Sequence, residues 1–405
     1  MTVRVVIAGG SFGGLGTAYE LRRHLGPERA TITLIAKDRR FTFVPSLPWV
    51  AMGSRTLEQI SFDLAEPLAR RSVGFVHQAI TGVDTERKVV STEAGEHPYD
   101  FLVIATGHRS ANEAVAGLGP FDGPGHSPMS PPEATELRTA IRTLLEDPGP
   151  VVVGAAPGAS CIGPAYELAF ELDCLLRRRT LRHQVPMTFL TPEPFLGHMG
   201  MGGAGKIRQL LEGELEERDI SYATSTAVTK ITSDAVEVAG AFPVPSVLSI
   251  VIPPLAGVDA VANSVGLANP KGFVPVDAHY RHQSADGVYA VGVAVAMAPV
   301  GDTRVPVNFP KTGHMTEQMA QIAARDIAAR IEGHDGGAVA ELSARCVLDM
   351  GDRGAYLAVD PVRPPRNAIP TVAEGRRWLL AKRAFERTYL WHAKRGRRMP
   401  TSLGW

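Results

Sequence analysis

Hydrophobic positions near the start of the chain follow a strand–turn–helix–strand order. Residues 4–8 (RVVIA) form a short β-branched run, residues 9–14 (GGSFGG) a glycine turn, and residues 15–25 a helix. The next apolar run, residues 31–35 (TITLI), is a second strand. A glycine turn between a strand and a helix, followed by a second strand, predicts a βαβ unit and a parallel sheet.

The same order returns about 145 positions later in the chain. Residues 151–153 (VVV), the loop 154–158 and a helix over about 162–178 lead to a strand at 187–190. Two such units in one chain predict an α/β fold with two Rossmann-like domains.

Two further strands lie on either side of the second unit, at residues 99–107 and 287–292. We therefore expect the second domain to be inserted in the first, with a helix at 318–331 packing back on the first domain. The predicted divisions are 1–108 with 271–332 for the first domain, 109–270 for the second, and 333–405 for a distinct C-terminal region.

Charge and composition exclude several classes of protein. The 405 residues hold 42 lysines and arginines against 42 aspartates and glutamates, which argues against nucleic-acid binding. The first residues run directly into an apolar strand, so we expect no secretory signal peptide. Apolar runs stay below the roughly 18 residues of a membrane-spanning helix. Cys161, Cys174 and Cys346 are too few for a disulfide scaffold and suit redox chemistry or a core position.

The first glycine turn has the features of a dinucleotide site. Residues 9–14 are a variant of G-x-G-x-x-G, with Ser11 at the middle glycine. Such a turn lets the backbone and a helix N-terminus approach a pyrophosphate, whereas the plainer interpretation is a tight turn alone. The flanking strand and helix and the small-residue turn at 105–107 favour nucleotide binding. Lys37 follows the second strand, where an acidic residue commonly holds ribose, so Asp38 is the candidate for that contact.

The second glycine loop is a poorer nucleotide site. Ala156 crowds the middle position, and Pro157 removes an N–H group that could face a phosphate. We expect this domain to keep the fold and to have lost the nicotinamide dinucleotide. A degenerate but working NADH site is the alternative.

Several segments carry a more specific pattern: 32–35 (ITLI), 43–50 (FVPSLPWV), 158–167 (GASCIGPAYE), 197–203 (GHMGMGG), 310–315 (PKTGHM), 346–352 (CVLDMGD) and 382–387 (KRAFER). Together they resemble the sulfide:quinone oxidoreductase family, over almost the whole chain. The segments around Cys161 and Lys311 are specific. Flavocytochrome c sulfide dehydrogenase and type II NADH dehydrogenase are relatives that share the fold.

The resemblance implies an FAD-dependent enzyme that oxidises sulfide and passes electrons to membrane quinone, with no metal. In that family two cysteines on one side of the flavin take up sulfide, and Cys161 and Cys346 stand at their positions. The residues expected to hold FAD, from the turn and the resemblance together, are Gly9, Ser11, Phe12, Gly13, Gly14, Lys37, Pro45, Ala105, Thr106, Gly107, Gly292, Lys311 and Gly313.

The residues themselves support a reactive Cys161. It lies at the predicted start of a helix, where the dipole lowers the pKa of a thiol below about 8.5 and favours the nucleophilic thiolate. The alternative is a small apolar residue that fills a gap in the core. The role of Cys346 depends more on the resemblance. Cys174, among leucines on one helix, is expected in the core.

Three polar residues near the thiols are candidates with open alternatives. Glu167, predicted to be catalytic, points within about 120° of Cys161 on the helix and is either a proton carrier or a solvated carboxylate. His198, also predicted to be catalytic, is either a group that titrates near neutral pH or a surface histidine. Lys311, beside the flavin by the resemblance, favours the anionic reduced flavin or is an ordinary surface lysine.

Two positions depart from the family pattern. Met129 stands where bacterial members often carry a third cysteine, and Glu133 replaces a nearby histidine. A covalent bond between flavin and that cysteine is therefore not expected.

The alternatives to the leading function are a type II NADH:quinone oxidoreductase, a sulfide dehydrogenase with another acceptor, and a flavin redox protein without turnover.

The C-terminal segment 376–398 is strongly basic, with nine lysines and arginines against Glu386. A helix here has an apolar stripe with basic residues roughly opposite, which suits peripheral, monotopic attachment to an anionic membrane that holds quinone. The alternative is a helix packed on its own domain with a solvated basic face. A homo-oligomer is left open. The stripe consists of Trp378, Ala381, Phe385 and Tyr389, and the opposite residues are Arg376, Arg383, Arg387 and Lys394.

Overall fold

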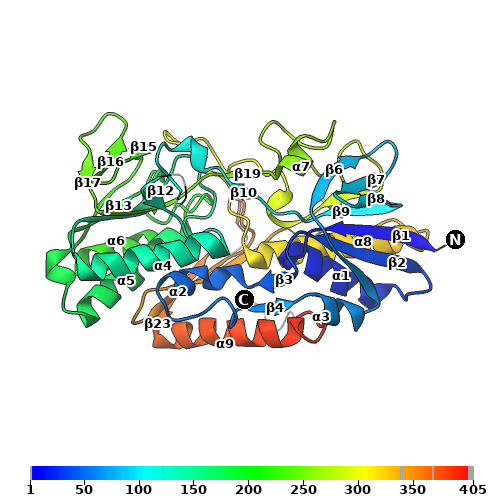
Figure 1. Cartoon of the computed structure of the whole chain (residues 1–405), viewed down its shortest axis with the longest axis horizontal. Helices are drawn as coiled ribbons and strands as arrows, with labels where there is room; N and C mark the ends of the chain where they lie inside the picture. The colour runs from blue at the N-terminus through cyan, green and yellow to red at the C-terminus, as the bar shows by residue number, and fades with distance from the viewer. Residues whose placement is uncertain are drawn as a thin grey trace.

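The computed structural model describes residues 2–119, 121, 123–337, 339, 341–366 and 369–399. It shows two α/β units side by side, with a C-terminal helix along one edge of the molecule (Figure 1). Parts of the predicted divisions lie outside the described residues, namely 1, 120, 122, 338, 340, 367, 368 and 400–405.

The first sheet is parallel throughout, in the order β20-β9-β1-β2-β5. Helix α1 (Phe12–His24) packs against β1, β2 and helix α8 (Gly313–Ile331). Strand β20 follows the whole second unit in the chain, so that unit is inserted in the first, as predicted. The strands are β1 (Val3–Ala8), β2 (Ala30–Ala36), β5 (Val73–His77), β9 (Phe101–Ile104) and β20 (Val288–Ala290).

The second sheet is also parallel, in the order β11-β18-β12-β13-β14, which confirms the predicted α/β fold with two Rossmann-like units. Where each domain begins and ends stays a prediction. The strands are β11 (Gly125–His126), β12 (Val151–Ala155), β13 (Met187–Leu190), β14 (Ile220–Ala223) and β18 (Leu248–Ile252), and the main helices are α4 (Pro131–Glu146), α5 (Gly163–Arg178) and α6 (Ile207–Glu217).

Smaller elements complete the two units. They are β3 (Arg40–Thr42), β4 (Ser61–Asp63), β6 (Ile80–Asp84), β7 (Val89–Thr92), β8 (Gly95–Pro98), β10 (Arg109–Ser110), β15 (Val228–Ile231), β16 (Ala235–Val238), β17 (Val244–Pro245) and β19 (Leu255–Ala256), with α2 (Leu47–Ala51), α3 (Ala65–Ala69), α7 (Asp259–Ala262) and the 3-10 turns η1 (Val44–Ser46), η2 (Asn112–Ala114), η3 (Arg182–Gln184) and η4 (Gly292–Ala294).

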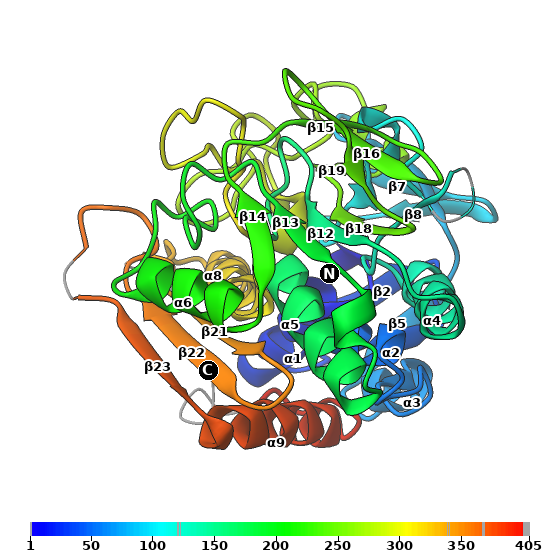
Figure 2. The same cartoon turned by 90° about the vertical axis from the view of Figure 1, so that its left-hand side faces the viewer.

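The C-terminal region contains a three-stranded antiparallel sheet that the sequence pattern did not predict. Its strands are β21 (Ala344–Asp349), β22 (Gly354–Val359) and β23 (Thr371–Gly375). Helix α9 (Arg376–Ala393) follows β23 directly and packs on this sheet (Figure 2).

The apolar stripe of α9 faces the protein, which corrects the expectation that it meets the membrane. Trp378 stacks on Tyr356 with ring centroids 4.3 Å apart, and Tyr389 lies 4.9 Å from Phe12. The outer face of α9 instead exposes Leu380, which is 64% accessible, among basic side chains. Within the part of the chain that the structure describes, no helix is both long and apolar enough to cross a bilayer.

Candidate active site

The predicted cofactor residues follow the carboxyl ends of adjacent parallel strands. Residues 9–14 come after β1, residues 105–107 after β9, Lys37 after β2 and Gly292 soon after β20. Because these strands are neighbours, the fold brings the residues to one edge of the first sheet, where ligands of such sheets bind. Their individual roles stay predictions.

The glycine turn is shaped for a dinucleotide. Gly9 has a φ of +120°, and a Cβ there would lie 2.2 Å from the carbonyl oxygen of Ala105. A Cβ on Gly14 would lie 1.8 Å from the carbonyl oxygen of Gly9. The turn therefore excludes side chains at both positions, and the first amides of α1 remain available to a pyrophosphate. The buried Thr106 hydroxyl has no partner among the described residues, and a cofactor oxygen would satisfy it. These groups fit the dinucleotide part of FAD.

A cavity of about 560 Å³ is lined by residues of both α/β units and of the C-terminal region. Cys161 and Cys346, which lie far apart in the sequence, both line it. The other predicted site residues in its walls are Phe12, Pro45, Glu167, Lys311 and Gly313. Residues in its walls that the sequence interpretation did not assign include Val44, Trp49, His108, Glu317, Gln318 and Lys382.

The pKa of the Cys161 thiol is raised, whereas the sequence pattern predicted a lowered one. Helix α5 begins at Gly163 with Ile162 as its N-cap, so Cys161 precedes the helix. Burial, and then the carboxylate of Glu167, raise the pKa of its thiol to about 11. The thiol is therefore protonated at neutral pH and needs a proton acceptor before it can act as a nucleophile.

Cys346 faces the same cavity from strand β21, paired with Leu357 on β22. Burial raises the pKa of its thiol to about 12, and Glu167 and Cys161 add to this rise, while the ammonium group of Lys382 opposes it. Both cysteines are free thiols in this structure. The carboxylate of Glu167 thus raises the pKa of both thiols, while the charge of Lys382 lowers that of Cys346.

Glu167 is buried, so the alternative of a solvated helix carboxylate is wrong. Its Oε1 atom accepts a hydrogen bond from the backbone N–H of Asp349 at 2.8 Å and forms an ion pair with Lys382 of α9. Burial raises the pKa of Glu167, and the charge of Lys382 is the largest influence that lowers it. Proton transfer with the thiols is compatible with this position, and the catalytic role stays a prediction.

Lys311 is partly buried rather than an ordinary surface lysine. Its Nζ donates to the carbonyl oxygens of Val293 (2.9 Å) and Val295 (2.6 Å) and lies 3.8 Å from the ring centre of Phe273. Burial lowers its pKa to about 7, so the surroundings disfavour the cation expected from the sequence. A negative charge beside it would favour the protonated form.

His198 is buried, which corrects the surface alternative, and it packs edge-on against Phe195 with ring centroids 5.3 Å apart. Its Nδ1 accepts from the N–H of Gly200 at 3.3 Å, and burial lowers its pKa. The cavity wall at this loop is made by Met199 and Met201. The structure therefore gives His198 a place in the loop rather than beside the thiols.

Glu317 of α8 is a titratable cavity residue that the sequence interpretation missed. Burial raises its pKa to about 7, against the lowering influence of Arg398 and of the Tyr389 hydroxyl, which donates to Glu317 Oε1 at 3.1 Å. Phe385, on the same face of α9 as Tyr389, also lines the cavity. The spacing of apolar residues on α9 predicts that this helix packs on the protein. It gives no signal that Glu317 of α8 lies opposite Tyr389.

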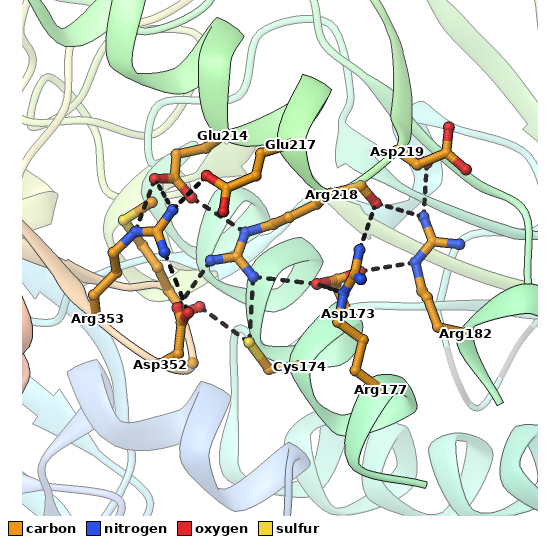
Figure 3. Close-up of polar contacts among 12 residues, drawn as sticks. Asp173, Cys174, Arg177, Arg182, Glu214, Glu217, Arg218, Asp219, Asp352 and Arg353 are labelled. Carbon is orange, nitrogen blue, oxygen red and sulfur yellow. Dashed lines mark hydrogen bonds and ion pairs between the residues drawn. The ribbon is translucent and has the colours of Figure 1, made fainter. Parts of the chain in front are cut away.

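A polar network holds the turn between β21 and β22 (Figure 3). Arg218 is buried, and its guanidinium donates to Asp173 (3.1 Å), to Asp352 in the β21–β22 turn (2.9 Å) and to the sulfur of Cys174 (3.3 Å). The network joins α5, the end of α6 and the β21–β22 turn. Cys174 is buried in it, as expected for a core cysteine.

Two parallel α/β units, a glycine turn shaped for a dinucleotide and two thiols in one cavity define a flavoprotein oxidoreductase with two Rossmann-like units. The family model described as pyridine nucleotide-disulphide oxidoreductase matches residues 3–322. The sulfide-quinone reductase of Aquifex aeolicus (strain VF5) is 36% identical, over 99% of this chain and 93% of that protein. The chain therefore belongs to the sulfide-quinone reductase family.

Further comparisons agree with this assignment. The X-ray structure of the sulfide:quinone oxidoreductase from Aquifex aeolicus superimposes with a TM-score of 0.95, covering 99% of this chain and 94% of that one at 36% identity. The type II NADH:quinone oxidoreductase of Staphylococcus aureus (strain NCTC 8325 / PS 47) is 29% identical over only 28% of this chain and 29% of that protein. The sequence alignment with this NADH enzyme therefore covers only one part of the chain, whereas the structure of NDH2 from Plasmodium falciparum shares the fold over 98% of this chain, with a TM-score of 0.72 at 12% identity.

Proposed function

We propose that the protein is an FAD-dependent enzyme that oxidises sulfide at Cys161 and Cys346 and passes the electrons to quinone. One observation carries this proposal: the two thiols line one cavity beside an edge shaped for a dinucleotide, in a chain of the sulfide-quinone reductase family. Bound FAD supplies the two-electron redox chemistry between the sulfur and the quinone.

The residues of the chain carry out the sulfur and proton steps. The two free thiols of this structure would form a Cys161–Cys346 bridge by giving two electrons to bound FAD and releasing their two protons. Hydrosulfide then attacks one sulfur of that bridge, so that the bridge breaks, a persulfide forms on that cysteine and the other sulfur leaves as a thiolate. Glu167, the buried carboxylate beside both thiols, is placed to accept protons that the thiols and hydrogen sulfide release. Lys311 is placed to meet negative charge that develops on its side of the cavity.

The second Rossmann-like unit does not favour NADH as the electron donor. The N–H of Gly158 in its glycine loop donates to the carbonyl oxygen of Pro306 at 2.6 Å, and the side chain of Asn308 donates to the Gly158 carbonyl oxygen at 2.6 Å. Glu193 follows β13, at the place where such folds often carry the carboxylate that binds the ribose. Its carboxylate already accepts hydrogen bonds from the hydroxyl of Tyr166 (2.7 Å), the hydroxyl of Thr191 and the N–H of Met199. The chain itself thus occupies the groups that would bind the nucleotide.

Anaerobic spectroscopy of the holoenzyme tests the proposal. We expect sulfide to bleach the flavin absorbance within seconds, a soluble quinone to restore it, and NADH at the same concentration to leave it unchanged. Rapid bleaching by NADH, with none by sulfide, would instead support a type II NADH:quinone oxidoreductase.

The outer face of α9 supports peripheral attachment to a membrane. Leu380 (64% exposed) and Trp391 (47% exposed) lie on it with the basic side chains of Arg383 and Arg387. Apolar and aromatic side chains among arginines suit the interface of an anionic bilayer. Val44, at the cavity wall, is also exposed, so a quinone dissolved in lipid would meet the cavity on the side where α9 lies.

Replacing Leu380 or Trp391 with glutamate is expected to weaken binding to anionic phospholipid vesicles by about tenfold, because apolar burial is lost and a repelled charge is added. Vesicle co-sedimentation at constant ionic strength measures this. Phe242→Glu is the matched control, since Phe242 is 93% exposed but belongs to the second α/β unit. Equal loss of binding in all three variants would contradict the role of α9.

A further inference from the structure

Behind the two thiols lies a buried group of charges to which the C-terminal helix contributes the cation. Lys382 extends from α9 into the cavity wall, where its ammonium group pairs with Glu167 and lies 5.1 Å from the ring centre of Trp49. The side chains of the pair are 12% and 7% exposed. An ion pair so far from water is costly to form and is strongly coupled, so neither partner keeps its charge easily without the other.

The surroundings of this pair show why Lys382 matters to Glu167. On α5, Glu171 has a buried oxygen without a partner among the described residues, and its pKa is raised well above the usual range by burial first. On β21, Asp349 already accepts from the indole N–H of Trp49 at 2.7 Å. The charged and titratable groups that face the pair are Glu171 from α5, Cys161 ahead of α5, Asp349 and Cys346 from β21, and, across the Trp49 ring, Arg55. The exposed Arg178 acts on Glu171.

Among the residues that the structure describes, Lys382 is the only cation that forms an ion pair with Glu167. The other groups near that carboxylate are acids, thiols or a more distant arginine. We propose that Lys382 is a positioning residue of the sulfide half-reaction, which keeps Glu167 ionised and oriented toward Cys161 and Cys346 so that Glu167 can accept their protons. This inference rests on the proposed function and adds a part for α9 in it.

A consequence is that α9 serves both halves of the reaction. Phe385 and Tyr389 line the cavity from the same helix, and Tyr389 donates to Glu317. Lys382, one turn earlier on α9, pairs with Glu167 in the wall of the same cavity as Cys161 and Cys346. Loss of Lys382 is therefore expected to affect the reaction with sulfide, whereas a helix that only bound membrane and quinone would leave that reaction unchanged.

The first test is independent of turnover and follows the apparent Tm of the holoenzyme from pH 5.5 to 8.5. In Lys382→Met, Glu167 has no cation, so its pKa in the folded state rises further above that in the unfolded state. The folded state then holds an extra proton, and its stability falls as pH rises through this window. We expect the Tm gap between wild type and K382M to widen by about 2–4 °C toward pH 8.5. In the double variant E167Q/K382M the gap should stay constant with pH.

The second test separates the two half-reactions by anaerobic stopped flow. In wild type, the rate of flavin reduction by sulfide is expected to rise with pH as Glu167 loses its proton. In K382M we expect this rise to occur at least one pH unit higher. At pH values below the rise, the K382M reaction is therefore about tenfold slower than that of wild type. Lys382→Arg should restore the wild-type profile. Lys394→Met, which removes an exposed cation of the same C-terminal segment, should match wild type. Reoxidation of dithionite-reduced K382M by a soluble quinone should stay within about twofold of wild type.

The inference is overturned if K382M and E167Q/K382M show the same pH dependence of Tm, or if the sulfide limb of K382M stays in place while only quinone reoxidation slows. A wild-type enzyme that sulfide does not reduce would refute the proposed function. In that case the Tm comparison still decides whether Lys382 holds Glu167 ionised.

Discussion

Cys346→Ala is expected to lower the rate of flavin bleaching by sulfide to below about a thousandth of the wild-type rate, and Cys161→Ala to do the same. Each variant removes one sulfur of the bridge that sulfide opens, so no persulfide and leaving thiolate can form together. Anaerobic stopped-flow spectroscopy at a fixed sulfide concentration measures the rate. Both variants should still bind FAD, because neither cysteine belongs to the glycine turn.

Cys174→Ala is the matched control. Cys174 is the third cysteine of the chain, is buried between α5 and the β21–β22 turn, and hydrogen-bonds to Arg218 and to Met350 rather than lining the cavity. Its bleaching rate should remain close to that of wild type. Normal bleaching in the Cys346→Ala enzyme would remove the basis of the proposed sulfur chemistry.

Glu317→Gln is expected to slow the reoxidation of reduced enzyme by quinone about a hundredfold, the usual scale for loss of a general acid. Reduction of quinone consumes two protons, and Glu317 is a carboxyl whose pKa is raised to about 7 in the wall of the cavity. Its protonated fraction falls as pH rises through 7, so the wild-type reoxidation rate should fall across the same range. In E317Q the rate should be low and independent of pH between 6 and 8.

Double-mixing stopped flow, with reduction by dithionite before quinone is added, isolates this step from the sulfide reaction. Glu332→Gln, which changes an exposed carboxylate just after the same helix α8, is the control. A pH-dependent rate that survives in E317Q would assign the proton donor to another group.

Patterns that repeat over many residues predicted the fold. Both βαβ units were predicted from apolar runs and glycine turns, because burial of parallel strands on both faces requires such runs. Helix α1 begins at Phe12 rather than at residue 15, since the glycines of its first turns lack the side chains that mark a helical face. The β21–β23 sheet was missed because its strands are separated by turns and loops of unequal length.

The site was predicted where the family pattern and local chemistry agree, and missed where distant segments meet. Cys161 and Cys346 were found by resemblance, and the cavity brings them together. Their high thiol pKa values depend on burial and on Glu167, which the sequence does not reveal. Lys382 was counted within a basic helix and within the family-like segment 382–387, but it was given no role, since nothing in the spacing of α9 distinguishes a lysine buried against α5 from one in solvent.

The glycine loop of the second α/β unit has a consequence for cellular energy metabolism. The carbonyl oxygen of Pro306 and the amide of Asn308 already satisfy Gly158, so restoring a glycine at Pro157 alone would not open the loop. If the second unit does not bind NADH, as proposed above, the enzyme is insulated from the pool of reduced pyridine nucleotides. Its contribution of electrons to respiration would then follow the supply of sulfide, whatever the ratio of NADH to NAD⁺ in the cell.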